Sequence, residues 1–332
     1  MMHTRLKKTP MRLAVLAASA ALALTACGGS DDAGGDGGDG GDSTEASGGG
    51  DLLSQLQDEG TITVGIADEN PYGFVDGDGN VTGEAPEVAR AVLGELGIEN
   101  IEAEVVDFGA LIQGLQAGQF DMIAAGMYIN ADRAQQINFS DPDYCVGEAF
   151  AVPEGNPKGL EDFQSVVDTD DVTIAILSGA VEEGYAADAG VPESKIQLFG
   201  DVNQQYESLA QGRVDAVTGT YLTVKQQVES RQGFEIVGPF TPLDADGNEV
   251  LGCGAFGFRP DNSAFCEAFN EQLNAMQDEG ELMPIITEFG FAEDDVQKAQ
   301  DLTVSDLTDG SAGACGSGGD GGGGDATEES TE

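Results

Sequence analysis

The sequence predicts an α/β fold built as two lobes. Apolar, β-branched runs alternate along the chain with segments of helical periodicity, which is the pattern of βαβ units with parallel strands. The alternation occurs twice, and both series contain one local repeat, LQAGQFDMI at 115–123 and LAQGRVDAV at 209–217. Residues 52–312, between two low-complexity ends, are also more than one compact core usually needs.

Each series supplies strands and helices in turn. In the first we expect strands at 61–67, 101–106 and 122–124 and helices at 85–96 and 110–117. In the second we expect strands at 172–177, 196–199 and 216–217 and helices at 181–189 and 204–211. In each repeat a glycine, Gly118 or Gly212, can adopt the left-handed conformation that ends a helix, and a strand follows the next aspartate.

The chain is expected to pass between the lobes twice. Asp141-Pro142 ends any preceding helix, and a strand is expected at 149–152. The DADGN turn at 244–248 precedes an expected strand at 253–259. The chain would therefore leave the first lobe, build the second and return.

The ends of the chain predict an exported, lipid-anchored protein. Four basic residues precede the apolar run 13–26, which is shorter than the ~20 residues of a membrane span but typical of a signal peptide. Leu24-Thr25-Ala26-Cys27 resembles a bacterial lipobox, so we expect a signal peptide at 1–26 and an acylated Cys27 at the outer face of the cell membrane. The alternative is an ordinary signal peptide with a chance cysteine. We expect a disordered Gly/Asp tether at 27–51 and a disordered acidic tail at 313–332.

The net charge of −48 excludes several functions. Binding to nucleic-acid phosphates or anionic lipid surfaces requires clustered Lys and Arg, which the chain lacks. The only histidine, His3, lies in the expected signal peptide, so the mature chain has no imidazole for triad catalysis or metal ligation.

Residues 52–312 hold 49 of the 61 acidic residues and nine of the 13 basic ones. Self-repulsion at this charge destabilises a compact state, and salt removes the penalty because the Debye length falls to ~3 Å at 1 M. We therefore hypothesise a high-salt exterior; the alternative is an ordinary acidic secreted protein. The melting temperature should rise between low and molar NaCl, and a midpoint independent of salt would contradict the hypothesis.

Four cysteines follow Cys27: Cys145, Cys253, Cys266 and Cys315. An even number in an oxidising compartment predicts two structural disulfides, and the sequence leaves three pairings open. Their spacing matches no zinc template, so we expect no metal and no cofactor.

Two motifs have the spacing of a ligand-binding site but are better explained as ordinary secondary structure. GCGAFG at 252–257 has the spacing of a dinucleotide fingerprint, yet it lies in an expected strand and no helix follows it. Asp76, Asp78 and Asn80 have the spacing of a calcium loop, but Val81 stands where an EF-hand requires glycine, so a hairpin turn is favoured.

The candidate site lies at three strand ends of the first lobe, the edge at which α/β sheets bind ligands. Glu69, Tyr72, Phe108, Tyr128 and Arg133 fall there. An arginine fork can hold a carboxylate, and aromatic rings beside an acid suit a delocalised cation. Core aromatics and a surface ion pair account for the spacing equally well.

The motifs GMYINADR at 126–133 and INFSDPDY at 137–144 resemble the signature of the polar amino-acid class of periplasmic binding proteins, the solute receptors of ABC importers. The resemblance covers residues 52–300. It implies a type II periplasmic-binding-protein-like α/β fold, in which each lobe is a mixed sheet flanked by helices and the lobes close about two hinge strands. The implied parts are lobe 1 (52–142 plus 253–312), lobe 2 (148–247) and hinges at 143–147 and 248–252.

The resemblance also implies partners and a disulfide pattern. A receptor of this class is expected to be a monomer that delivers a small zwitterionic solute to an ABC permease and its ATPase. The family's hinge positions place Cys145 and Cys253 at adjacent crossings, so their pairing is implied, and we pair Cys266 with Cys315 in the same hypothesis.

Two departures from the amino-acid receptors point to one group of ligands. Those receptors carry an aspartate for the ligand amine where this chain has Thr220, and a small hydroxyl residue where it has Tyr128. The exchange resembles the ectoine- and hydroxyectoine-binding receptors of the family, as do GEAPEVA at 83–89 and IAAGMY at 123–128.

The resemblance to ectoine-binding receptors implies a role for each candidate residue. Arg133 would hold the ligand carboxylate, Glu69 would pair with the ring nitrogens, and Tyr72, Phe108 and Tyr128 would surround the cation. The N–H groups of 179–182 would bind the same carboxylate, with Val181 in place of the usual threonine. The expected ligand-binding set is Glu69, Tyr72, Phe108, Tyr128, Arg133, Val181 and Thr220.

Two other functions stay open. The receptor could bind another zwitterion, such as a betaine or an amino acid. The chain could also be an enzyme on this fold, such as a dehydratase or a transglycosylase, with Glu69 as the only pocket carboxylate that the sequence nominates. We expect a receptor and no catalytic residues.

Overall fold

The computed structural model describes residues 52–308, 310 and 313–316. The expected signal peptide, the acylated Cys27 and the tether lie outside the described residues, as does the tail beyond residue 316. Within the described part, no helix has both the length and the apolar character that a membrane crossing requires.

The first sheet is mixed, as expected. Its strands in spatial order are β4 (Asn100–Val105), β1 (Thr61–Ile66), β5 (Met122–Tyr128), β13 (Cys253–Phe258) and β6 (Asn138–Phe139), and β7 (Tyr144–Cys145) also pairs with β13. β4, β1 and β5 are parallel, and β13 is antiparallel to its neighbours. The helices of this lobe include α1 (Leu52–Glu59), α2 (Glu84–Glu95), α3 (Leu111–Gln116), α4 (Ala131–Ala134), α9 (Ser263–Asp278) and α10 (Leu282–Glu288).

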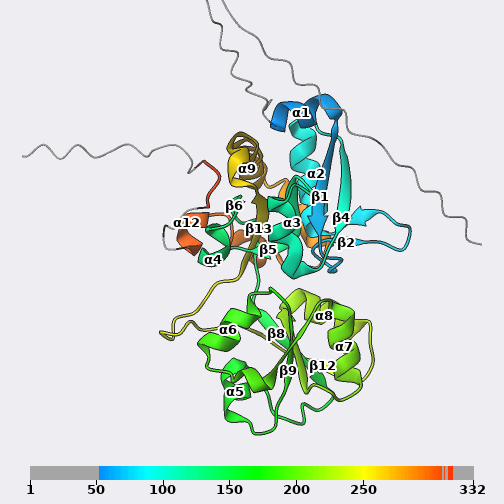
Figure 1. Ribbon diagram of the computed structural model, residues 1–332, viewed down its shortest axis with the longest axis vertical. Helices are drawn as coiled ribbons and strands as arrows, with labels where there is room; N and C mark the ends of the chain where they lie inside the picture. The colour runs from blue at the N-terminus through cyan, green and yellow to red at the C-terminus, as the bar shows by residue number, and fades with distance from the viewer. Residues whose placement is uncertain (1–51, 309, 311–312, 317–332) are drawn as a thin grey trace, which may run out of the picture. The chain divides into compact units, whose positions relative to one another are not determined.

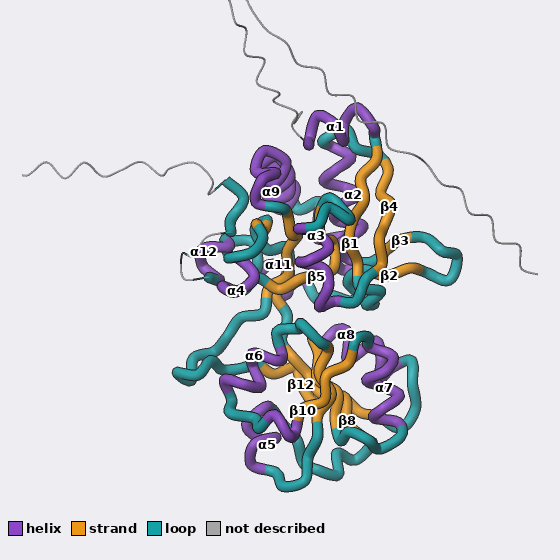
Figure 2. The backbone as a smooth tube through the Cα atoms, in the orientation of Figure 1, coloured by secondary structure: helices purple, strands orange, loops and turns teal. Residues whose placement is uncertain are grey.

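The second sheet is also mixed. Its spatial order is β10 (Ile196–Phe199), β9 (Ile174–Leu177), β11 (Ala216–Thr220), β8 (Glu148–Pro153) and β12 (Phe234–Phe240), with β8 antiparallel to β11 and β12. Its helices are α5 (Phe163–Asp168), α6 (Glu182–Asp188), α7 (Val202–Ala210) and α8 (Tyr221–Glu229), and Figures 1 and 2 show them around this sheet. The predicted two-lobed α/β fold is confirmed.

β5 explains why the first sheet has helices on both faces. All seven of its residues are buried. Met122 and Ala124 belong to one core cluster with α2 and α9, whereas Ile123 and Ala125 belong to a second cluster with α3. Successive side chains of a strand point to opposite faces, so a strand without polar positions requires cover on both.

The local repeat makes the same contacts in both lobes. Gly118 and Gly212 have φ of 69° and 64°, as expected at a helix end. The Asp121 carboxylate accepts from the Thr63 N–H at 3.1 Å, and the Asp215 carboxylate accepts from the Thr173 N–H at 2.9 Å. Each repeat aspartate therefore ties a late strand of its lobe to the lobe's first parallel strand.

The two chain crossings between the sheets lie side by side. The Val146 N–H donates to the Gly252 carbonyl at 3.0 Å, and a disulfide joins the adjacent Cys145 and Cys253. The segment 244–248 forms the expected turn, in which the Gly247 N–H donates to the Asp244 carbonyl.

The motifs at 252–257 and 76–80 form a strand and a hairpin turn, as expected. The 252–257 motif lies almost entirely in β13. The 76–80 segment forms the expected hairpin turn between β2 (Phe74–Val75) and β3 (Val81–Thr82), and the Asp76 carboxylate is occupied by N–H groups of Asp78 and Asn80.

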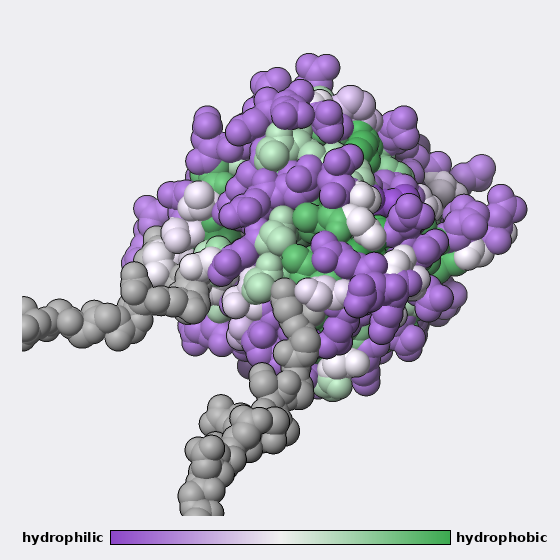
Figure 3. Space-filling view, turned by 90° about the horizontal axis from the view of Figure 1, so that it is seen from above, coloured by the Kyte–Doolittle hydropathy of each residue, from purple (hydrophilic) through white to green (hydrophobic). Residues whose placement is uncertain are grey.

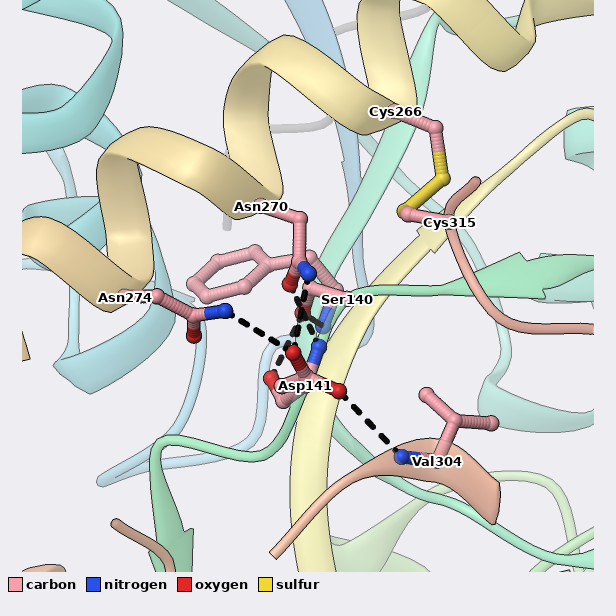
Figure 4. Close-up of a disulfide and its surroundings, with 8 residues drawn as sticks. Ser140, Asp141, Cys266, Asn270, Asn274, Val304 and Cys315 are labelled. Carbon is pink, nitrogen blue, oxygen red and sulfur yellow. Dashed lines mark hydrogen bonds between the residues drawn. A yellow bond between two sulfur atoms is a disulfide. The ribbon is translucent and has the colours of Figure 1, made fainter. Parts of the chain in front are cut away.

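The C-terminal segment wraps onto the first lobe through α11 (Glu293–Gln297) and α12 (Val304–Leu307). Figure 4 shows Asp141 bound by Asn270 and Asn274 of α9 and by the Val304 N–H. Two residues beyond α12 are fixed to the first lobe: Ala314 forms a β-bridge with Phe139, and Cys315 forms a disulfide with Cys266. The expected start of the disordered tail at residue 313 is therefore wrong, because backbone bonds and the disulfide fix the chain through Cys315.

The surface is strongly hydrophilic on the face drawn in Figure 3. Only four Lys or Arg side chains of the described residues form an ion pair with a carboxylate within 4.0 Å: Arg90, Lys158, Arg259 and Lys298. Most described carboxylates therefore depend on solvent ions for charge compensation, which is the physical basis of the salt prediction.

Candidate functional site

All seven residues of the expected ligand-binding set line one cavity between the two lobes. The centre of a water-sized molecule can occupy about 40 Å³ of this cavity. Glu69, Tyr72, Phe108, Tyr128 and Arg133 reach it from the first lobe, and two residues reach it from the second lobe, Val181 before α6 and Thr220 at the end of β11.

Arg133 is held as a buried cation on the cavity wall. The Asn130 side chain caps α4 by accepting from the Arg133 N–H at 2.9 Å. The guanidinium donates to the Tyr128 carbonyl at 2.7 Å and to the Gly179 carbonyl at 2.9 Å, and its Cζ lies 5.5 Å from the centre of the Phe108 ring. Burial lowers the pKa of Arg133 to about 10, so the group stays charged at neutral pH.

Glu69 follows β1 and is 9% exposed. Its carboxylate accepts from the Thr223 hydroxyl at 2.6 Å, and Thr223 in turn accepts from the Thr220 hydroxyl at 3.2 Å. Burial raises the pKa of Glu69 to about 7, the bond from Thr223 opposes this, and the Glu182 charge adds to it. The carboxyl group therefore titrates near neutral pH.

The cavity holds a second carboxyl group that the sequence did not predict. Glu182 lines it and is 4% exposed, and the fully buried Glu148 lies against Glu182. Burial raises the pKa of both groups, and the Arg133 charge partly offsets the effect at Glu182. Glu69 is therefore not the only pocket carboxylate. Glu182 stood in the 179–182 motif, whereas no local signal marked Glu148.

The three aromatic residues expected to surround the ligand cation, Tyr72, Phe108 and Tyr128, also make contacts within the protein. The Phe108 ring already contacts the Arg133 guanidinium. Tyr72 stacks on Tyr144 with ring centres 5.5 Å apart, and the Tyr128 hydroxyl donates to the Val146 carbonyl at 3.1 Å. A further ring, Tyr206 of α7, lines the cavity and was missed, because nothing in the sequence distinguishes it from a core residue.

The expected carboxylate site at the N–H groups of 179–182 is wrong in part. The Gly179 N–H donates to the Glu183 carboxylate at 2.6 Å, and the Ala180 N–H donates to the Leu177 carbonyl at 3.1 Å. α6 begins only at Glu182 and has seven residues. Two of the four amides are therefore occupied by the chain itself.

The lobes contact each other around the cavity. Among the described residues, three hydrogen bonds join the first lobe to the second: Glu69 with Thr223, Arg133 with the Gly179 carbonyl, and Asn70 with Gln226 at 3.3 Å. Two of them involve candidate ligand-binding residues, so closure of the lobes and geometry of the site are linked.

A buried carboxyl pair lies behind the aromatic wall. The Glu84 N–H donates to the Pro71 carbonyl at 2.9 Å, which ties the start of α2 to the loop that carries Tyr72. The Glu84 side chain faces Asp143, and both are buried without a cation. Burial and the neighbouring Asp143 raise the pKa of Glu84, and burial raises the pKa of Asp143 to about 6.

This pair predicts a stability that falls as pH rises. A raised pKa in the folded state stabilises the fold at low pH, and the contribution is lost as pH rises through the folded pKa. Glu84→Gln removes one ionisation, so the variant should lose less stability than the wild type between pH 5 and pH 8. Urea unfolding from pH 5 to 8.5 measures this. Glu87→Gln, on the same helix but partly exposed, should leave the pH profile unchanged, and an unchanged profile in Glu84→Gln would contradict the assignment.

Within the described residues, no group of three or more His, Cys, Asp or Glu side chains is arranged to hold a metal ion. The cavity instead offers one guanidinium, ionisable carboxyl groups, hydroxyls and aromatic faces. This set of groups can hold a small organic molecule that carries both an anionic and a cationic part.

Residues 62–292 match the profile of the family described as bacterial extracellular solute-binding proteins, family 3. A probable amino-acid ABC transporter periplasmic-binding protein, y4tE of Sinorhizobium fredii, is 32% identical over 77% of this chain and 85% of its own length. The arginine-binding extracellular protein ArtP of Bacillus subtilis is 29% identical over 81% of this chain and 93% of its own length.

Solved structures agree in fold. The crystal structure of EhuB in complex with hydroxyectoine has a TM-score of 0.70 at 32% identity and covers 77% of this chain and 96% of that chain. An ancestral arginine-binding protein bound to glutamine has a TM-score of 0.61 at 28% identity and covers 70% of this chain and 98% of that chain.

Proposed function

This chain is a member of family 3 of the bacterial extracellular solute-binding proteins, and we propose that it is a lipid-anchored receptor for ectoine and hydroxyectoine. It is a solute-binding receptor of an amino-acid-type ABC importer, and receptors of this class work with a permease and an ATPase. The proposal concerns the solute and the anchor.

One observation carries the choice of solute: Arg133 and Glu69 line the same buried cavity, together with aromatic rings. Ectoine is a zwitterion with a ring amidinium and a carboxylate. Its carboxylate suits the Arg133 fork, and its amidinium suits the Glu69 carboxylate between aromatic faces. The hydroxyectoine-bound structure among the similar proteins supports this assignment for the cavity.

Thr220 supports a ring amidinium over the amine of an α-amino acid. The position carries a hydroxyl rather than a carboxylate, and this hydroxyl donates through Thr223 toward Glu69. The acidic partner for the ligand's cation is thus supplied by the first lobe. A compact amine would lose the carboxylate that the amino-acid receptors carry at the position of Thr220.

The proposed mechanism follows from the groups on each lobe. The solute first meets Arg133, Glu69 and the rings of the first lobe, and the second lobe then covers it with Val181, Glu182 and Thr220. Removal of water strengthens both charge pairs, so the bound solute stabilises the closed form. The permease would receive the solute when the lobes separate.

An amino-acid ligand is the second candidate, because several relatives carry amino-acid names. Glu182 favours it, since this carboxyl group could accept an amine from the second lobe. An enzyme on this fold is disfavoured, since the matched relatives are binding proteins. Recovery of chemically altered solute from the protein would favour an enzyme.

Isothermal titration in molar salt tests the choice of solute. The panel is ectoine, hydroxyectoine, glycine betaine and glutamine. We expect tight binding of ectoine or hydroxyectoine and no heat from glutamine. Heat from glutamine alone would contradict the proposed ligand while leaving the receptor class intact.

The pKa of Glu69 predicts that affinity for ectoine rises with pH. Only the ionised carboxyl group pairs with an amidinium, so protonation below about pH 7 should weaken binding, by up to about tenfold per pH unit. Titration at pH 6, 7 and 8 measures the slope. Glu69→Gln should bind more weakly with a flat profile, and a slope that persists in this variant would assign the effect to Glu182 or Glu148 instead.

The lipid anchor is tested at Cys27. Growth with a labelled fatty acid should label the wild type, and Cys27→Ser should abolish the label and release the protein into the medium. A labelled Cys27→Ser variant would contradict the proposed anchor.

A further inference from the structure

The two lobes touch backbone to backbone at one point of the cleft rim. On the first lobe the contact is Gly109, in the short helix η1 (Phe108–Ala110), and on the second it is Ser178 and Gly179, just before α6. A Cβ placed on Gly109 would lie 2.8 Å from the Ser178 carbonyl oxygen, and one on Gly179 would lie 2.6 Å from the Gly109 Cα. Both distances are too short for a carbon side chain, and the opposing atoms are backbone that cannot rotate away.

The backbone of Gly109 does not itself require glycine. Gly179 has a φ of 80°, which disfavours any other residue, whereas Gly109 has no positive φ. Only the opposing lobe therefore excludes a side chain at position 109. Gly109 is exposed even while the lobes are in contact, so a methyl group there would meet solvent once the lobes separate.

The contact adjoins the ligand-binding groups on both lobes. Gly109 directly follows Phe108, whose ring contacts the Arg133 guanidinium. The Gly179 carbonyl accepts from the same guanidinium at 2.9 Å. A displacement of the second lobe at this point would therefore lengthen the Arg133 bond and move Val181 and Glu182 away from the cavity.

We propose that Gly109 is a positioning residue that sets how far the lobes close, and that its lack of a side chain brings Arg133 and the second lobe together on the solute. The inference rests on the receptor closing over its ligand, as proposed above, but not on the identity of that ligand. A side chain at position 109 raises the free energy of the closed form and leaves the separated form unchanged. The solute is held by both lobes in the closed form. Its binding free energy is therefore weakened by the amount by which the side chain raises the free energy of that form.

The test compares Gly109→Ala and Gly109→Val with the wild type and with Gly94→Ala. Gly94 lies in α2 of the same lobe, and a Cβ there meets nothing within 4 Å. Titration with ectoine, hydroxyectoine, glycine betaine and glutamine gives the affinities, and the melting temperature without solute reports on the fold. For the solute that the wild type binds, we expect about tenfold weaker binding in Gly109→Ala, a larger loss in Gly109→Val, and wild-type affinity in Gly94→Ala.

A merely structural role for Gly109 makes a different prediction. It would lower the melting temperature measured without solute, which the proposal leaves within about 2 °C of the wild type in all three variants. Wild-type affinity in both position-109 variants, or a matching loss in Gly94→Ala, would overturn the proposal. If the wild type binds glutamine or glycine betaine but not ectoine, the proposed ligand fails, and the affinity ratio for the bound solute still tests the role of Gly109.

Discussion

Arg133→Ala should weaken ectoine binding by ~2–5 kcal/mol, because the ligand carboxylate would be buried without its charged partner. The side chain is 7% exposed and lies against the Phe108 ring and the carbonyls of Tyr128 and Gly179. The affinity of Arg133→Lys should lie between those of the wild type and Arg133→Ala, since a lysine keeps the charge but loses the planar fork. Titration calorimetry measures each affinity.

The matched control is Arg90→Ala. Arg90 is on the first lobe, and its side chain is 40% exposed beside Glu87. Loss of a surface ion pair typically costs less than about 1 kcal/mol, and ectoine affinity should not change. Near-wild-type affinity in Arg133→Ala would refute the carboxylate role.

Removal of the Cys145–Cys253 disulfide should give the largest loss of stability. The bond joins residues 108 positions apart, and the whole second lobe lies within the loop that it closes. Loop-closure entropy assigns about 4–5 kcal/mol to such a bond. The double variant Cys145→Ala/Cys253→Ala should therefore melt roughly 10 °C or more below the wild type.

The second disulfide supplies the comparison. Cys266–Cys315 closes a loop of 49 positions and fastens only the end of the C-terminal segment to α9. That segment can detach while the two sheets stay folded, so Cys266→Ala/Cys315→Ala should cost less. Equal losses in both double variants would show that the bond at the crossings has no special role.

The sequence was sufficient for the fold because its signals are local. β-branched runs, glycines after helices and the Asp141-Pro142 break each act within a few residues, and the structure has an element near every predicted position. Within each lobe the strand ends meet at one edge of the sheet, and the seven candidate residues, five from the first lobe and two from the second, line one cavity between the lobes.

The remaining features of the site depend on contacts distant in sequence. Glu148 lies on β8 and Glu182 on α6, and the two side chains meet only in the folded lobe. Tyr206 reaches the cavity only through the placement of α7. The 179–182 amides were misjudged because nothing in the sequence shows that Glu183 binds the Gly179 N–H. Gly109 carries no sequence signal at all, since its role exists only where two lobes touch.

The most direct test of the account is a crystal structure of the protein grown with ectoine. We expect ectoine in the cavity, with its carboxylate within hydrogen-bond distance of the Arg133 guanidinium and its ring nitrogens facing Glu69. The ring should lie against Tyr72, Phe108 and Tyr128. Ectoine bound elsewhere, or with its carboxylate away from Arg133, would contradict the account.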